Sequence, residues 1–365
     1  MAHPLCGADP ATLARVMRRA GLPEKPLAAS AIALSVLARQ PFSLAERLVM
    51  DRRLPATDAL APPVFILGHW RSGTTHLYNI MTKSGAWAYV PPIATGLPWD
   101  LFGLARAFRP LLERALPKHR YIDKIPVNPD SPQEDEIAIA NMSDLSFYHG
   151  VYFPRAFGEF MSRGVFFDGC DAEEVARWEE RFCYLMRKLS HLQGGKPLLI
   201  KNPVYTARMG LLAETFPLAK FIHIHRNPYD VFVSMRNFYK KLFAEFALQD
   251  CALIDVDEVI VQVYARMMDA FEADAAAIDP ARLVELRYDD LDEAPVAAVE
   301  RVYDALRLSG FDAAKPLVES YVASVKSFEK NRFAIADDAA AKVEARLGAY
   351  VAKWGYRRPT GAARG

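Results

Sequence analysis

At residues 64–75 the chain reads Val64-Phe65-Ile66-Leu67-Gly68-His69-Trp70-Arg71-Ser72-Gly73-Thr74-Thr75. The four apolar residues at its start predict a short, buried parallel strand. Gly68 and Gly73 predict a tight turn after this strand, and residues 74–81 can continue as a helix. A strand, a glycine turn and a helix in this order begin a β-α-β unit.

Three further strands are predicted downstream of this segment. They cover residues 197–200, 220–225 and 283–288, with a helix at about 206–215 and another that opens at Pro228. Strands that alternate with helices are typical of a parallel sheet covered on both faces. The sequence therefore predicts an α/β fold with a P-loop-like central parallel sheet flanked by helices.

The rest of the chain is organised around this sheet. Residues 1–60 predict a helical N-terminal extension, with helices near 9–20, 27–40 and 43–53 and a break at Gln40-Pro41. The α/β domain is expected over residues 61–335. It contains an insert at about 86–190 that is rich in loops, prolines and aromatic residues. Residues 336–365 complete the chain as a C-terminal helix and tail.

Composition excludes several classes of protein. The chain has 45 Lys and Arg against 44 Asp and Glu, so its net charge of +1 argues against a nucleic-acid partner. Its four cysteines are scattered and suggest neither a zinc site nor a disulfide framework, which favours a reducing, cytoplasmic location. No secretory signal and no transmembrane segment are expected. Peripheral contact with a membrane and the oligomeric state stay open.

The loop after the first predicted strand has the composition of a phosphate site. Its G-x4-G frame, Gly68 to Gly73, would direct backbone N–H groups at an anion, and Thr74 and Thr75 can add hydroxyl donors. In nucleoside-triphosphate hydrolases a lysine follows the second glycine, but Thr74 stands there in this chain. Arg71 is the cation that the loop offers instead, which argues against a standard ATPase or GTPase.

A second anion site is predicted after the strand at 220–225. Arg226 follows the end of this strand, where open parallel sheets bind ligands, and Ser234 lies far enough into the next helix to face back toward it. A guanidinium and a hydroxyl at a helix start suit a phosphate monoester. The alternative is a structural Arg226 paired with a carboxylate, with Ser234 an ordinary helix residue.

Together the two motifs resemble the sulfotransferases that use 3′-phosphoadenylyl sulfate (PAPS), especially bacterial-type members related to the tyrosylprotein sulfotransferases. In that family an R-S-G-T-T loop holds the 5′-phosphosulfate, and an R-x7-S element holds the 3′-phosphate. The segment 286–291 resembles one whose tyrosine lies near the adenine, and a basic loop often covers the 3′-phosphate. The resemblance implies that PAPS is bound by Arg71, Ser72, Gly73, Thr74, Thr75, Arg226, Ser234, Tyr288, Lys330 and Arg332.

The resemblance also implies catalytic roles. Arg71 would neutralise the negative charge that develops on the leaving bisphosphate, and positioning and charge stabilisation would supply most of the rate. Lys201-Asn202-Pro203 is similar to the K-x-P element of tyrosylprotein-type members, so Lys201 would hold the sulfuryl oxygens. The alternative for Lys201 is an ordinary surface lysine. No metal is expected.

The general base is harder to assign. The histidine motif of cytosolic family members is not found, and Pro91 and Pro92 stand where tyrosylprotein sulfotransferases have a glutamate. Glu134, in the acidic segment 131–136, is the candidate, because neighbouring carboxylates would raise one another's pKa. The alternative is structural, because Ser131 and Glu134 have the spacing of a helix capping box. His149 and His119 are lower candidates.

The sequence therefore predicts an enzyme that moves a sulfuryl group from PAPS to a hydroxyl or amine and releases adenosine 3′,5′-bisphosphate. The aromatic-rich insert suggests a small-molecule or lipid acceptor with an apolar body. Two alternatives stay open. One is a P-loop kinase or nucleotide hydrolase, and the other is a protein that binds the nucleotide without catalysis.

Overall fold

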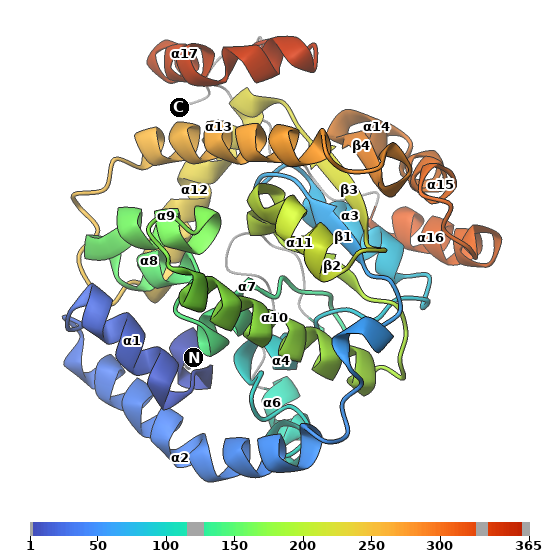
Figure 1. Cartoon of the computed structure of the whole chain (residues 1–365). Helices are drawn as coiled ribbons and strands as arrows, with labels where there is room; N and C mark the ends of the chain where they lie inside the picture. The colour runs from blue at the N-terminus through green and yellow to red at the C-terminus, as the bar shows by residue number, and fades with distance from the viewer. Residues whose placement is uncertain (1–2, 115–127, 326–334, 360–365) are drawn as a thin grey trace. The chain divides into compact units, whose positions relative to one another are not determined.

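The computed structural model describes residues 3–114, 128–325 and 335–359 (Figure 1). The candidates His119, Lys330 and Arg332 lie outside these ranges. The chain divides into two compact units, and each is described by itself. Unit 1 comprises residues 1–61, 88–198 and 240–254, and unit 2 comprises residues 62–87, 199–239 and 255–365. The domain boundaries expected from the sequence stay a prediction.

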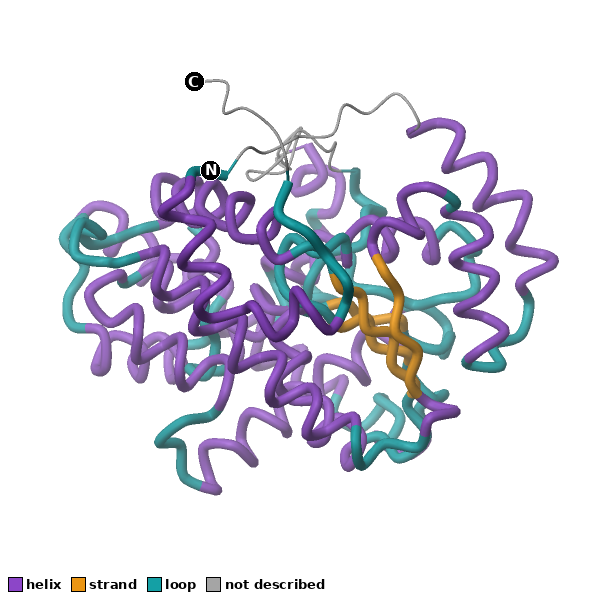
Figure 2. Tube along the Cα trace, turned by 90° about the horizontal axis from the view of Figure 1, so that it is seen from above, coloured by secondary structure: helices purple, strands orange, loops and turns teal. Residues whose placement is uncertain are grey.

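The described part of unit 2 contains one sheet of four parallel strands in the order β2-β1-β3-β4. Figure 2 shows the strands of this sheet in orange. In the register of the sheet, Leu67 lies beside His223 and His225 lies beside Arg287. This sheet confirms the predicted fold class, although two strands are shifted from their expected bounds. The strands are β1 (Val64–Leu67), β2 (Leu199–Lys201), β3 (Lys220–His225) and β4 (Leu283–Arg287).

Two groups of helices pack around this sheet. Helices α3, α15 and α16 form one group, and α11, α13 and α17 form the other, with the 3-10 turn Pro203–Arg208 packed on α13. In Figure 1 the strands lie between α11 and α16. The helices of unit 2 are α3 (Thr74–Thr82), α11 (Met209–Thr215), α13 (Val256–Ala275), α14 (Tyr288–Glu293), α15 (Pro295–Ala305), α16 (Phe311–Val325) and α17 (Asp337–Lys353). Helix α12 (Pro228–Phe246) begins in unit 2 and ends in unit 1.

The described part of unit 1 is helical, and its aromatic residues form its core. Trp99, Tyr152, Phe153 and Trp178 are almost completely buried, as are most aromatic side chains of the predicted insert. The density of aromatics therefore reflects packing rather than an open pocket. The other helices of unit 1 are α1 (Pro10–Ala20), α2 (Pro26–Met50), α4 (Pro92–Gly96), α5 (Leu104–Ala107), α6 (Arg109–Arg114), α7 (Glu136–Met142), α8 (Tyr148–Tyr152), α9 (Phe157–Phe166) and α10 (Ala172–Leu192).

The N-terminal extension differs from the prediction in one respect. A break at Gln40-Pro41 was expected, but α2 runs without interruption and has Pro41 inside it. Proline removes one helical hydrogen bond and clashes with the preceding turn, which costs about 3 kcal/mol. Arg39 and Ser43, on either side of Pro41, both bond to the buried Asp100. These tertiary contacts hold the helix together across the proline.

His69 and His149 are buried, and burial disfavours their charged form. Burial lowers the pKa of His69 and of His149 from 6.5 to about 4. His149 lies in the core of unit 1, where its Nε2 lies 3.0 Å from the Ser143 carbonyl oxygen. Because the folded pKa lies below the unfolded pKa, the unfolded chain binds more protons between these two values. The stability that each neutral histidine contributes is complete above pH 6.5 and is lost as the pH falls toward 4.

We expect the free energy of unfolding to fall between pH 6.5 and pH 4, by up to about 3 kcal/mol for each such histidine. Urea denaturation across this range measures the slope. His149→Gln, whose amide can still donate to Ser143, should reduce the slope by about one proton. An unchanged slope in this variant would show that His149 is not buried in its neutral form.

Candidate active site

Four of the residues predicted to bind the nucleotide or to act in catalysis lie at one edge of the sheet of unit 2. Because all four strands are parallel, their carboxyl ends meet there. Arg71 follows β1, Lys201 ends β2, Arg226 follows β3 and Tyr288 follows β4. The strand order reverses between β1 and β3, and open α/β sheets bind ligands at such a switch point. Topology therefore brings residues far apart in the sequence to the same edge of the sheet.

The loop between β1 and α3 has a conformation that requires its glycines. Gly73 has a φ of 100° and Gly68 a φ of 135°. A Cβ on Gly68 would lie 2.2 Å from the Ile224 carbonyl oxygen, and one on Gly73 would lie 2.2 Å from Cδ2 of Tyr288. Arg71 also has a positive φ, of 68°, which is uncommon for a residue with a side chain. The tight turn predicted from the G-x4-G frame is confirmed.

Some of the donors in this loop are used to hold its shape. The Gly68 N–H donates to Thr206 Oγ1 at 2.8 Å. The hydroxyl and the backbone N–H of Ser72, which is almost completely buried, both donate to the His69 carbonyl oxygen. Thr206 was not among the predicted site residues. It lies 138 residues away, and nothing in the local sequence indicates that it supports the loop.

A hydrogen bond joins the two predicted anion motifs. Arg71 Nε donates to Ser234 Oγ at 2.9 Å, across 163 residues of sequence. Ser234 was expected to face Arg226, but its observed partner is the arginine of the other motif. This contact fixes the direction of the Arg71 guanidinium, because the side chain of Ser234 is itself almost completely buried in α12.

Lys201 lies beside the start of α3. Its Nζ donates to Thr75 Oγ1 at 3.2 Å, and the residue is only 1% exposed. The alternative of an ordinary surface lysine is therefore wrong. Thr74 and Thr75 form the first turn of α3, where the helix dipole adds positive potential. A buried ammonium and a helix N-terminus at one point favour an anionic ligand.

Arg226 and Tyr288 pack against each other. The Arg226 guanidinium carbon lies 4.5 Å from the centre of the Tyr288 ring, and the same ring covers Gly73. Asp230, in the first turn of α12, lies 3.8 Å from Arg226, a long distance for an ion pair. Burial raises the pKa of Asp230, and the charge of Arg226 acts against this shift. The aromatic ring and the guanidinium thus form one wall beside the loop.

The two histidines of β3 are held by neighbours within unit 2. His223 Nδ1 lies 3.0 Å from Glu285 Oε2, and its ring stacks on Phe271 at 3.8 Å. His225 lies 3.1 Å from the hydroxyl of Tyr356. Among the described residues, no group of three or more His, Cys, Asp or Glu side chains could hold a metal ion.

Glu134 lies in unit 1, in the loop that precedes α7. The capping box suggested by Ser131 and Glu134 is wrong, because α7 begins at Glu136 and Asp135 occupies the N-cap position. Ser131 Oγ instead accepts from the Asn128 N–H at 2.9 Å. Asp135 and Glu136 are fully buried, and Glu136 accepts from Ser146 Oγ at 2.6 Å. Of the three neighbouring carboxylates, Glu134 is the one that is partly exposed.

Comparison with known proteins identifies relatives of this chain. A sequence model of the sulfotransferase family matches residues 62–313. Omega-hydroxy-beta-dihydromenaquinone-9 sulfotransferase Stf3 of Mycobacterium bovis, and the protein of the same name in Mycobacterium tuberculosis, are each 30% identical over 323 residues, 87% of this chain and 81% of the relative.

Solved structures share the fold at lower identity. Sulfotransferase STF1 of Mycobacterium tuberculosis superimposes with a TM-score of 0.66 at 16% identity, covering 92% of this chain and 90% of that one. Sulfotransferase STF9 of Mycobacterium avium gives a TM-score of 0.67 at 15% identity, covering 96% and 88%. At these identities the likeness shows the fold alone.

We expect Gly73→Ala to destabilise the protein by about 2 kcal/mol more than Gly85→Ala. Both glycines have positive φ, 100° and 70°, so both alanines are strained, but only the one at 73 meets the Tyr288 ring. Urea denaturation of the two variants measures the difference. Equal losses would show that Tyr288 does not close over the loop.

Proposed function

The chain belongs to the sulfotransferase family, and from this premise we propose that it moves a sulfuryl group from PAPS to an apolar, lipid-like acceptor. The observation that carries the donor assignment is the meeting of three cations, Arg71, Lys201 and Arg226, at one edge of the sheet. Family membership favours this activity over the kinase and the non-catalytic alternatives. Thr74, in place of the P-loop lysine, agrees with it.

The residues at the sheet edge fit the donor nucleotide. Gly68 and Gly73 have no room for a Cβ against β3 and Tyr288, which fits the tight turn of a loop whose backbone N–H groups face an anion. We assign the 5′-phosphosulfate end to Arg71, Thr74 and Thr75, and the 3′-phosphate to Arg226. Ser72 and Gly73 shape the loop. The assignments of Tyr288 to the adenine and of Ser234 to the 3′-phosphate stay predictions, as do those of Lys330 and Arg332.

When bound, PAPS supplies a sulfuryl group that is transferred as its bond to the phosphate oxygen breaks. Arg71 stabilises the charge on that oxygen electrostatically, since a guanidinium does not give up its proton. Ser234 keeps the Arg71 guanidinium in place through the 2.9 Å hydrogen bond. Lys201 carries its charge in a buried position beside Thr75, where positive charge is more effective than in water.

We keep Glu134 as the proposed general base for an acceptor hydroxyl. Its neighbours Asp135 and Glu136 are fully buried, and Glu136 is bound to Ser146, so neither is open to an acceptor. His149 is buried in the core of unit 1, and its pKa of about 4 makes it a weak base. Glu134 is therefore the best candidate among the groups that the sequence offered.

The acceptor is proposed to be apolar because of the relatives. The two Stf3 proteins are named for a dihydromenaquinone derivative, a lipid with a terminal hydroxyl, and the chain matches them over 87% of its length. The aromatic residues of unit 1 do not support an apolar acceptor, because most of them are buried in the core. A cytoplasmic location stays a prediction.

We expect Arg71→Ala to lower kcat about 100- to 1000-fold while the affinity for adenosine 3′,5′-bisphosphate falls less. Arg226→Ala should weaken that affinity about 10- to 100-fold, because a charge-assisted hydrogen bond to a phosphate remote from the reacting bond is lost. Calorimetry and steady-state kinetics measure both effects. Arg301→Ala is the control, since Arg301 is exposed in unit 2 and pairs only weakly with Asp290. Unchanged affinity in Arg226→Ala would contradict the donor assignment.

Glu134→Gln should lower kcat about 100-fold or more and leave the affinity for adenosine 3′,5′-bisphosphate unchanged, because it removes a base and not a donor contact. Asp130→Asn is the matched control. Asp130 lies in the same loop, and its side chain is 81% exposed. Turnover of Glu134→Gln at the wild-type rate would end the assignment of the base.

A further inference from the structure

Helix α2 (Pro26–Met50) presents its apolar face outward. Thirteen of its residues are exposed, and twelve of these are apolar, with Ser30 the exception. Leu27, Leu34 and Leu48 are exposed by 87%, 70% and 68%. At 100° per residue the exposed positions fall within an arc of about 160°, so they form one continuous face of the helix. A surface helix of a soluble protein has the opposite arrangement.

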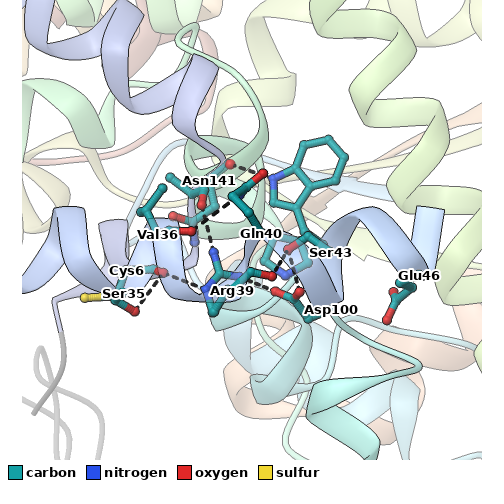
Figure 3. Close-up of polar contacts among 12 residues, drawn as sticks. Cys6, Ser35, Val36, Arg39, Gln40, Ser43, Glu46, Asp100 and Asn141 are labelled. Atoms are coloured by element: carbon teal, nitrogen blue, oxygen red, sulfur yellow. Dashed lines mark hydrogen bonds and ion pairs between the residues drawn. The ribbon is translucent and has the colours of Figure 1, made fainter. Parts of the chain in front are cut away.

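The buried face of α2 carries the polar residues (Figure 3). Arg39 forms an ion pair with Asp100, and Ser43 Oγ donates to the same carboxylate at 2.5 Å. Glu46 lies 2.6 Å from the ammonium of Lys188, and both side chains are buried. Charged contacts within unit 1 therefore fix the orientation of α2. Because its polar residues make these buried contacts, its apolar side faces outward.

These contacts decide whether α2 could cross a membrane or lie on its surface. By length and composition α2 could cross one, although core helices of soluble proteins pass the same test. Only 22% of its most apolar window is buried, so α2 is not a core helix. A spanning position would take Arg39 and Glu46 away from their partners and into hydrocarbon, at a cost of several kcal/mol. The helix is suited to lie on a membrane rather than to cross it.

The charges at the two ends of α2 favour a lipid surface over a second copy of the chain. Lys25 precedes the helix, and Arg52 and Arg53 follow it, all of them exposed. The acids beside them are Glu24, which is paired with Arg155, and Asp51, so the two ends together keep an excess of positive charge. In either relative orientation, two copies packed through this face would bring cations close to cations. An anionic membrane has the opposite charge and accepts both the apolar face and its basic ends.

We propose that the exposed face of α2 inserts into the boundary between headgroups and acyl chains of an anionic membrane. The choice of a membrane also draws on the proposed function, since an apolar acceptor dissolves in the lipid phase and an enzyme held at its surface can reach it. The membrane contact itself needs neither donor nor acceptor. It can therefore be tested separately from sulfuryl transfer.

The test is flotation of the purified full-length chain with vesicles of phosphatidylcholine and phosphatidylglycerol, without donor or acceptor. Leu34→Glu places a charge at the centre of the apolar face and should weaken vesicle binding at least about tenfold. Leu218→Glu is the matched control: Leu218 is also 70% exposed, but it lies in a turn of unit 2. This control and the wild type should float equally.

Two results would overturn the proposal. One is equal flotation of Leu34→Glu and the wild type. The other is a wild-type protein that does not float with either lipid and is a dimer by light scattering, while Leu34→Glu is a monomer. A second copy of the chain would then cover α2. Turnover of a detergent-dispersed acceptor is measured in parallel. If the wild-type protein shows no turnover, this counts against sulfuryl transfer and does not change the conclusion from vesicle flotation.

Discussion

The hydrogen bond from Arg71 to Ser234 joins the two parts of the donor site. It connects the loop after β1 with the helix after β3, and it exists because these two parallel strands are neighbours in the sheet. Gly68 and Gly73 let the loop pass close to β3 and to Tyr288. The cations at this edge thus depend on one constraint, a parallel sheet whose order reverses between β1 and β3.

The parts of the site that the sequence predicted are the local ones. β1 and β3 have the predicted bounds. β1 is a short apolar run that ends at Gly68, and β3 is rich in aromatic and β-branched residues and is closely followed by Asn227-Pro228. The loop glycines and Lys201 could be placed because Gly68 directly follows β1, Gly73 directly precedes α3 and Lys201 ends β2. Contacts between distant segments could not be predicted. Thr206 accepts a hydrogen bond from the loop, and Ser234 accepts one from Arg71. Only the sheet topology brings these partners close together.

Two errors have the same origin. The break at Pro41 and the capping box at Ser131 were both inferred from local rules for helix ends. In the structure, contacts to Asp100 hold α2 together across Pro41, and α7 begins at Glu136. The sequence also did not predict that the apolar face of α2 is exposed. Apolar residues at helical spacing look the same whether they face a core or a lipid, and only the buried ion pairs decide the direction.

The most direct measurement of the donor site compares the affinities of adenosine 3′,5′-bisphosphate, adenosine 5′-phosphate and adenosine 3′-phosphate for the wild-type protein by calorimetry. If Arg71 and Arg226 hold opposite ends of one nucleotide, removal of either phosphate should weaken binding at least about tenfold, or roughly 1.4 kcal/mol. A single phosphate that binds as tightly as the bisphosphate would show that the two arginines do not share one ligand.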